Sequence, residues 1–402
     1  MLSRRALATV LQSLLASELL AARGRGSPVA RLPGHLSCTW PESMRLDHGS
    51  GTGLGCDSLE KLWLASAANE MFNLHELGSE GDLLTNPTFG AWIEHIEEAW
   101  RSGITSMTFS TSGATGRPKR CTHDAGHLHT EAEFLSDLFR DRQRIVSLIP
   151  AHHAYGFLFS ALLPDALAVE HLDATYLSPG DLARSLAPGD LVVTFPERWQ
   201  WLERSLAVWP MDVEGVVSTA PCPQGLIAAL HDRGLAGMTE VYGTSETAGV
   251  AVRRWPEPSY RLMSHWRFAE RDSDVAPMVV HRSGRRYPLP DDLRTQDDDR
   301  FQLLGRRDGA VQVGGVNVYP NQVAAQLGEH PGVRSAAARL MRPEEGRRLK
   351  AFIVPEAGIE EATLREDLRA WMESTLPTPA RPAALTFGPH LPVGRTGKPA
   401  DW

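Results

Sequence analysis

The sequence predicts an α/β protein, with a large N-terminal domain built on doubly wound, mainly parallel sheets and a small α+β C-terminal domain. Three observations lead to this prediction. Short apolar runs alternate with helical patterns between residues 104 and 242, which is typical of successive βαβ units. This alternation is lost after residue 250, and a different pattern of strands and helices begins near residue 310. The chain has 402 residues, 42% of them hydrophobic, which is enough for two packed domains.

The elements of the large domain follow from hydrophobic periodicity. Apolar runs bounded by turn residues predict strands at 104–109, 145–149, 191–195, 215–219 and 239–242. Amphipathic patterns predict helices at 90–102, at about 124–142, from 157, and at 197–208 and 223–234. Residues 21–100 are expected to be irregular apart from the helix that begins at residue 90. Residues 250–304, which are rich in Arg, Pro and Asp, show no regular alternation.

The small domain is predicted from a second set of elements. Strands are expected at 310–313, 316–319 and 348–354, and helices from 320 and at 360–375. We therefore divide the chain into residues 1–307 and 308–402.

The N-terminal segment has an arginine pair, Arg4-Arg5, followed by apolar residues, which is compatible with a signal peptide. Polar residues such as Gln12 and Glu18 interrupt the apolar run, and the leucines recur at helical spacing. We predict an amphipathic helix packed on the body of the protein, and no membrane span, because a span needs about 18 or more apolar residues.

Composition limits the function classes. The net charge of −8 and pI near 6.0 give no electrostatic footprint for nucleic acid. The four cysteines, Cys38, Cys56, Cys121 and Cys222, form no C-x-x-C pair, so neither a zinc site nor a disulfide framework is indicated. A reducing cytoplasm is the simplest location.

The stretch from Ser110 to Lys119 (STSGATGRPK) combines small hydroxyl side chains, glycines and a final lysine. Glycines admit positive φ, so successive backbone N–H groups can converge on one anion. With a strand before it and a helix after it, the stretch predicts a phosphate cradle; a flexible surface loop is the alternative. A P-loop kinase or ATPase would need Gly-Lys-Ser/Thr in direct succession, which is not present here.

Two further segments lie at the ends of predicted strands. Glu246, in Tyr242–Glu246 (YGTSE), can hold Mg²⁺ through its carboxylate, although a lone Glu at this position is often only a helix cap. His152 and His153 could belong to a metal site, but adjacent loop residues rarely ligate one ion and no third ligand lies nearby in the sequence.

Taken in order, these segments resemble the motifs of the adenylate-forming superfamily, which includes acyl-CoA synthetases, aryl-acid ligases, luciferases and peptide-synthetase adenylation domains. The phosphate loop is followed by Pro150–Phe157, Ser218–Pro223, Tyr242–Glu246, Gly305–Asp308 and Leu391–Lys398, in the family's order. The resemblance covers residues 104–398 and describes a compact member.

The resemblance implies roles for the residues on these motifs. It implies ATP or AMP binding for Thr111, Ser112, Gly113, Thr115, Gly116, Lys119, Ala220, Pro221, Tyr242, Gly243, Asp297 and Arg306. It implies catalytic roles for Lys398, His153, Ser245 and Glu246, with Glu246 as the Mg²⁺ ligand, and an acid pocket formed by His153, Tyr155, Ala220, Gly243 and Thr244. For the ribose-binding acid, Asp298 and Asp299 are alternatives to Asp297. Asp308 is implied as the hinge, and Gly314 and Gly315 as the hairpin beside the path of the thiol.

The implied reaction has two steps. A carboxylic acid attacks the α-phosphate of ATP with Mg²⁺, and the acyl group then passes to the thiol of CoA or of a carrier-protein phosphopantetheine. An aromatic, hydroxybenzoate- or cinnamate-like acid is expected, because the large domain is compact and Pro150–Phe157 has no Asp to hold an amino group. A short or medium aliphatic acid, a luciferase-like oxygenase and a non-catalytic relative are the alternatives.

Overall fold

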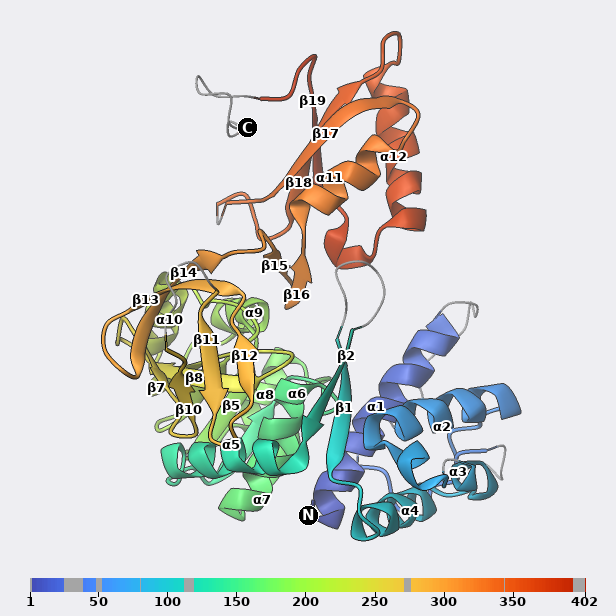
Figure 1. Ribbon diagram of the computed structural model, residues 1–402, viewed down its shortest axis with the longest axis vertical. Coiled ribbons are helices and arrows are strands. Elements are labelled where there is room, and N and C mark those ends of the chain that lie inside the picture. The colour runs from blue at the N-terminus through green and yellow to red at the C-terminus, as the bar shows by residue number, and fades with distance from the viewer. Residues whose placement is uncertain are drawn as a thin grey trace.

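The computed structural model describes residues 2–24, 39–47, 53–79, 81–111, 119–270, 276–342, 344–392 and 402 (Figure 1). It confirms the predicted class, because a large mixed sheet carries helices on both faces and a small α+β domain follows it in the chain. The predicted division at residue 308 remains a proposal.

The large sheet has nine strands in the order β13-β14-β9-β8-β7-β6-β5-β3-β4. Its parallel half contains β3 (Arg144–Ser147), β4 (Glu170–Asp173), β5 (Asp190–Thr194), β6 (Glu214–Val217) and β7 (Gly237–Thr244). Its antiparallel half adds β8 (Ala248–Arg254), β9 (Tyr260–Leu262), β13 (Asp291–Thr295) and β14 (Arg300–Arg306). The prediction of no regular alternation in 250–304 therefore overlooked antiparallel strands, which need no intervening helices.

The parallel strands form the centre of the domain, because both of their faces are covered. Every residue of β5 is buried: Leu191 and Val193 belong to one hydrophobic cluster, while Val192 belongs to another on the opposite face. Continuous apolar runs of this kind are expected for buried parallel strands. The covering helices are α5 (Ala125–Leu138), α6 (Ala154–Phe157), the π-helical segment η3 (Leu158–Leu162), α7 (Leu163–Leu167), α8 (Pro179–Ser185), α9 (Pro196–Ser205) and α10 (Gln224–Asp232).

An N-terminal group of helices packs beside this sheet domain and consists of α1 (Arg4–Gly24), α2 (Ser58–Phe72), η2 (Leu74–Leu77), α3 (Asp82–Thr85) and α4 (Phe89–Arg101). The prediction that residues 21–100 are irregular apart from the helix at 90–102 is therefore wrong. Asp57 and Glu60 form a capping box that starts α2, and its buried face includes Leu64, Ala68 and Phe72. Exposed apolar residues on the same helix, Leu59, Leu62 and Trp63, obscured its periodicity.

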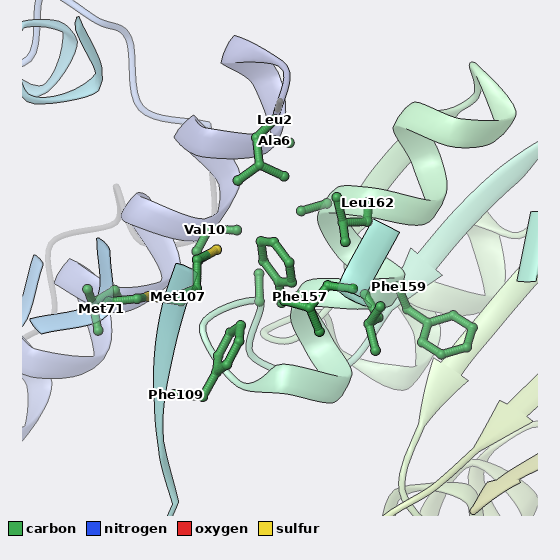
Figure 2. Close-up of a cluster of buried hydrophobic side chains, with 14 of the residues drawn as sticks. Leu2, Ala6, Val10, Met71, Met107, Phe109, Phe157, Phe159 and Leu162 are labelled. Atoms are coloured by element: carbon green, nitrogen blue, oxygen red, sulfur yellow. The ribbon is translucent and has the colours of Figure 1, made fainter. Parts of the chain in front are cut away.

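Helix α1 packs on the body of the protein, as predicted. Figure 2 shows Val10 and Ala6 of α1 facing Met107 of the neighbouring strand and Phe157 of α6. Within the described ranges, Arg4–Arg23 is the one helix long and apolar enough to cross a membrane, and 44% of it is buried inside the structure. In Figure 2, Ala6 and Val10 of this helix, together with Leu2 just before it, lie in a cluster of buried hydrophobic side chains.

The phosphate loop lies in a hairpin. Strand β1 (Ser106–Thr111) pairs antiparallel with β2 (Lys119–Asp124) in a separate two-stranded sheet, which stands between the N-terminal helices and the large sheet in Figure 1. The predicted order of strand, loop and helix is therefore wrong at one point, because β2 comes between the loop and α5. Asp124 then caps α5 by accepting hydrogen bonds from the backbone N–H groups of Gly126 and His127.

A three-stranded sheet packs beside the antiparallel half and contains β10 (Trp266–Phe268), β11 (Met278–His281) and β12 (Arg286–Pro288). The small domain has a core of its own, formed by residues between 313 and 380. Its elements are β15 (Val311–Val313), β16 (Val316–Val318), α11 (Pro320–Gly328), β17 (Val333–Leu340), β18 (Leu349–Pro355), α12 (Glu361–Thr375), η4 (Thr378–Ala380) and β19 (Ala384–Phe387).

Candidate active site

The predicted motifs follow the carboxyl ends of neighbouring parallel strands. The loop with His153 follows β3, the loop with Ala220 follows β6, and Tyr242–Glu246 ends β7, while Thr194 at the end of β5 lies between them. Open α/β sheets bind ligands at this edge. The topology therefore gathers three of the sequence motifs at one edge of the sheet.

Glu246, which follows β7, contacts Lys119 at the start of β2, and the two side chains form an ion pair. Burial raises the pKa of the Glu246 carboxyl, but hydrogen bonds from Lys119, its own backbone N–H and Thr244 outweigh this effect and leave the pKa below its ordinary value. The carboxylate is therefore ionised at neutral pH and remains 45% exposed.

This arrangement fits a Mg²⁺ ion that shares its coordination with a substrate. No group of three His, Cys, Asp or Glu side chains in the described ranges could hold a metal ion alone. Mg²⁺ usually keeps several waters and takes only one or two carboxylates together with substrate phosphates. An exposed, ionised Glu246 beside the lysine of the phosphate hairpin meets that requirement.

The backbone around Glu246 adopts an unusual path that requires a glycine. A Cβ atom at Gly243 would lie 1.9 Å from the carbonyl oxygen of Ala248, so no other residue fits there without a shift. A β-bulge lies between Tyr242 and Gly243, and the hydroxyls of Thr244 and Thr247 lie 3.0 Å apart. The glycine of the motif is therefore explained by a close approach of the backbone.

His153 lies at the N-terminal end of α6 and donates a hydrogen bond to the carbonyl of Ser110 in β1. More than a third of its surface is exposed, yet the protein packed around the ring lowers its pKa below the ordinary value. Gly156 of the same motif is required, because a Cβ atom there would lie 1.9 Å from the carbonyl oxygen of Pro150. The structure thus links His153 directly to the strand that leads into the phosphate loop.

Tyr155 lies in the first turn of α6. Its hydroxyl donates a hydrogen bond to the carbonyl of Thr194 at the end of β5, over 3.3 Å, and its ring meets Phe159 edge to face at 5.2 Å. The ring of Tyr155 therefore has a fixed position at the carboxyl end of the parallel strands. Ala220 is half-buried after β6, and Pro221 beside it is exposed.

Tyr242 is 9% exposed and packs against Tyr260 and Phe301. Its hydroxyl donates a hydrogen bond of 2.7 Å to Asp291, and Asp291 lies opposite Arg306 in the β13–β14 pair. Burial raises the pKa of Asp291, while the hydrogen bond from Tyr242 and the charge of Arg306 act against this rise.

The structure does not bring Asp297 to Arg306. Asp297 lies in the turn between β13 and β14, where it accepts a hydrogen bond from the backbone N–H of Arg300. Its neighbours Asp298 and Asp299 lie in the same exposed turn. The acidic residue beside Tyr242 and Arg306 is Asp291, which sequence analysis missed because its partner becomes clear only when the register of the hairpin is known.

The hinge candidate Asp308 bridges the end of the large sheet and the start of the small domain. It accepts hydrogen bonds from Arg306 at 2.6 and 2.8 Å, from the backbone of Ala310 and from the hydroxyl of Tyr319. The hydrogen bond from Arg306 is the main reason why the pKa of Asp308 falls to about 2.

The glycine hairpin of the small domain faces the large domain. Gly314 and Gly315 join β15 to β16 with positive φ angles of 58° and 78°. A Cβ atom at Gly315 would lie 3.4 Å from the hydroxyl of Thr219, beside Ala220. In this arrangement the hairpin therefore lies next to the loop that follows β6.

Several predicted site residues lie outside the described residues. They are Ser112, Gly113, Thr115 and Gly116 of the phosphate loop and Lys398 near the C-terminus. Thr111 ends β1 and pairs with Lys119, and only its backbone is described. Ser245 contributes its carbonyl oxygen, which accepts a hydrogen bond from His123 of β2, a contact that sequence analysis did not foresee.

Comparison with known proteins supports the resemblance. Residues 322–398 match the AMP-binding enzyme C-terminal domain. A 4-coumarate–CoA ligase of Halorhodospira halophila is 36% identical over 400 residues, or 97% of this chain and 97% of that protein. Another 4-coumarate–CoA ligase, from Rhodobacter capsulatus, is 39% identical over 362 residues, or 87% of this chain and 90% of that protein. Among solved structures, the amide bond synthetase McbA from Marinactinospora thermotolerans has a similar fold, with a TM-score of 0.60 at 18% identity, covering 97% of this chain and 92% of that chain.

The two ligases align with this chain over almost its whole length, at an identity well above that of the fold-level neighbour. The fold and the enzyme class predicted from the motifs are therefore confirmed. The chain belongs to the adenylate-forming superfamily and is an AMP-forming acid–thiol ligase.

Proposed function

We propose that this enzyme activates an aromatic acid of the hydroxycinnamate type and transfers its acyl group to CoA. One observation carries the choice of substrate: relatives named 4-coumarate–CoA ligase align with almost the whole chain at 36% and 39% identity. 4-Coumarate is named as the substrate of those relatives. Whether it is also assigned to this chain depends on the residues of this chain.

The acid side of the site supports a flat, uncharged substrate body. Tyr155 is fixed by its hydrogen bond to Thr194 and by its contact with Phe159, so it offers an aromatic surface of fixed geometry. His153, whose pKa is lowered by burial, is neutral at pH 7 and uses one ring nitrogen on Ser110. The motif carries no acidic residue to hold an ammonium group.

In the first step, a carboxylate oxygen of the acid forms a bond to the α-phosphorus of ATP, and the bond from that phosphorus to the bridging oxygen breaks. Pyrophosphate leaves with the electron pair. Mg²⁺, when bound, neutralises negative charge that develops on the phosphate oxygens. Glu246 would hold it, the β1–β2 hairpin with Lys119 would bind the outgoing phosphates, and Lys398 would place its ammonium between the carboxylate and the α-phosphate.

The nucleoside would lie between Tyr242 and the loop with Ala220 and Pro221. We assign the ribose hydroxyls to Asp291 and Arg306 in place of Asp297, because Asp291 lies opposite Arg306 in the β-pair and accepts the hydrogen bond from Tyr242. A carboxylate with a free acceptor position is a suitable partner for a pair of hydroxyl donors.

In the second step, the sulfur of the thiol attacks the acyl carbon, AMP leaves, and the thiol proton passes to solvent. We propose that residues 308–402 turn about Asp308 between the two steps. The position of Gly315 next to Thr219 supports a thiol path along the glycine hairpin in the arrangement seen here. CoA is the proposed acceptor because it is the one named for the relatives, and a carrier-protein phosphopantetheine is the alternative.

The described cysteines, Cys56, Cys121 and Cys222, are buried free thiols. Together with the use of CoA, they support a cytoplasmic location. Cys38 lies outside the described residues.

The test is a pyrophosphate-exchange screen with aromatic, short-chain and long-chain acids, followed by a comparison of CoA with a phosphopantetheinylated carrier protein. The proposal predicts the highest kcat/KM with a hydroxycinnamate and thioester formation on CoA. A higher kcat/KM with an aliphatic acid refutes the choice of acid, and thioester only on the carrier protein refutes the choice of acceptor. Light or O₂ consumption with the adenylate would instead identify an oxygenase.

A further inference from the structure

A small cavity lies beside the loop that carries Glu246. Its volume is about 10 Å³, close to the lower limit of roughly 10–15 Å³ that one water molecule requires. The residues around it come from separate parts of the chain: His123, His127, Leu128, Glu131, Glu246, Thr247, Ala248, His265, Trp266, His281 and Tyr287. Such a cavity, lined by polar groups and sized for one molecule, is a site for a bound water.

Three buried polar atoms of this lining have no hydrogen-bond partner in the described ranges: Oε1 of Glu131, Nδ1 of His265 and Nε2 of His281. Their residues are only 2%, 4% and 3% exposed. Leaving such atoms without partners costs free energy, so a shared partner is expected. A water molecule needs two to four polar partners, and the three atoms supply that number.

The protonation of the cluster matches this role. Burial raises the pKa of Glu131 to about 8, so its carboxyl is mainly protonated at neutral pH and can donate. Burial lowers the pKa of His265 and of His281 to about 4, so both rings are neutral. Nδ1 of His281 accepts a hydrogen bond from the backbone N–H of Ser283, so Nε2 of this ring carries the hydrogen and can donate to the water, while Nδ1 of His265 can accept from it. The three groups that would bind the water are therefore uncharged and suit water rather than a metal ion, in agreement with the absence of a three-ligand metal group among the described residues.

The same Glu131 holds the backbone close to Glu246. Its Oε2 accepts a hydrogen bond of 2.9 Å from the backbone N–H of Gly249. Gly249 must lack a side chain, because a Cβ atom there would lie 2.1 Å from Oε1 of Glu131. On the other side of Glu246, Nε2 of His123 donates a hydrogen bond of 2.8 Å to the carbonyl oxygen of Ser245. Glu246 thus lies between two backbone positions that are held by buried side chains.

We propose that the cavity binds one water molecule between Glu131, His265 and His281, and that Glu131, through this water and Gly249, is a positioning residue for Glu246. The water fixes the orientation of the Glu131 carboxyl. The carboxyl in turn fixes the segment that follows Glu246, so that the Mg²⁺ ligand faces Lys119. The catalytic part of this inference depends on the proposed function; the water site does not.

Two variants of similar size separate hydrogen bonding from packing. Glu131→Gln keeps an acceptor for Gly249 and a donor for the water, whereas Glu131→Met fills the same space without either. Glu133→Met is the matched control, because Glu133 is an exposed residue of the same helix. We expect pyrophosphate exchange to fall at least about tenfold in Glu131→Met, since small displacements of a catalytic group can cost up to about 10²-fold. Glu131→Gln and Glu133→Met should stay within about threefold of the wild type on the same scale.

The Mg²⁺ dependence distinguishes positioning from general destabilisation. Glu131→Met should raise the Mg²⁺ concentration needed for half-maximal exchange and leave thioester formation from a supplied acyl-adenylate almost unchanged. Equal loss in both half-reactions, or an unchanged Mg²⁺ requirement, overturns the positioning role.

Two measurements do not depend on turnover. Calorimetry with Mg²⁺ and a non-hydrolysable ATP analogue should show weaker metal-dependent binding to Glu131→Met than to Glu131→Gln. A high-resolution crystal structure of the wild type should show one ordered water within hydrogen-bond distance of Glu131, His265 and His281, and a cavity without solvent density overturns the site. If no acid supports exchange while both of these results hold, the proposed substrate class fails and this inference stands.

Discussion

Because the ion pair between Lys119 and Glu246 is exposed, one substitution should affect the stability of the protein little and its catalytic rate strongly. Glu246→Gln removes the negative charge and keeps the size of the side chain. The two side chains are 60% and 45% exposed, and exposed pairs of this kind contribute about 0.2–1 kcal/mol. The free energy of unfolding should therefore fall by no more than about 1 kcal/mol, which shifts the Tm of a domain of this size by roughly 2–4 °C at most.

The effect on catalysis should be much larger. Replacing the carboxylate removes the proposed Mg²⁺ ligand at the point where charge develops on the phosphates. Losing one electrostatic contact to a transition state costs about 2.7–4 kcal/mol, or 10²–10³ in rate. The assay is Mg²⁺-dependent pyrophosphate exchange, with thermal unfolding of the same preparation.

A matched control lies on the neighbouring residue of the same strand. Arg120 pairs with Glu70 of α2, and this pair is also exposed, at 69% and 31%. Glu70→Gln should have a similar small effect on Tm and leave exchange within about twofold, because the loss of an exposed ion pair alone costs little. Wild-type exchange in Glu246→Gln would refute the assignment, since it would make the residue only a partner of Lys119.

Other outcomes follow from the same geometry. In the pyrophosphate-exchange assay, Asp291→Asn should lower kcat/KM for ATP by about 10–100-fold, because a hydrogen bond to a charged group contributes about 1.5–3 kcal/mol. Asp297→Asn should stay close to the wild type in the same assay. Equal effects of the two variants would refute the assignment of the ribose contact. Lys398→Ala should slow pyrophosphate release by about 10²–10³ and leave thioester formation from a supplied adenylate almost unchanged. Asp308→Pro should slow thioester formation and leave pyrophosphate release almost unchanged, because proline fixes φ at the proposed hinge. Equal loss of both half-reactions in either variant would contradict domain alternation. Because the pKa of Glu131 is raised from 4.5 to about 8, the stability linked to its proton is complete below pH 4.5 and is lost as the pH rises through 8. Urea unfolding should therefore show the wild type losing stability relative to Glu131→Gln between pH 5 and 8, and a constant difference would show that Glu131 is already ionised.

The buried parallel strands, which are covered on both faces by helices, were predicted from the sequence. The strand at 191–195 was found because a buried parallel strand is a continuous apolar run, as β5 is. Strand β2 was not found, because only Cys121 and His123 of its six residues are buried and the rest are polar or charged. Helix α2 was missed for the opposite reason, since apolar residues such as Trp63 remain exposed on its outer face.

Candidate site residues that lie together in one short segment could be named from the sequence. The segments Tyr242–Glu246 and Ser110–Lys119 were singled out from residue type and order alone, and their roles in catalysis and phosphate binding stay predictions. Asp291 could not be named in this way, because its role depends on the register with Arg306 and on the hydroxyl of Tyr242, which come from three strands. The buried Glu131 was overlooked for the same reason, since its partners lie far away in the sequence and a glutamate in an amphipathic helix usually faces solvent.

The central claim is that this chain couples the cleavage of ATP between its α- and β-phosphates to the formation of a thioester. The most direct measurement is the product balance with a hydroxycinnamate, MgATP and CoA, by chromatography of all nucleotides and thioesters in one reaction. The account predicts equal amounts of AMP, pyrophosphate and acyl-CoA, and an enzyme-bound acyl-adenylate when CoA is omitted. ADP with inorganic phosphate, or thioester without AMP, would contradict it.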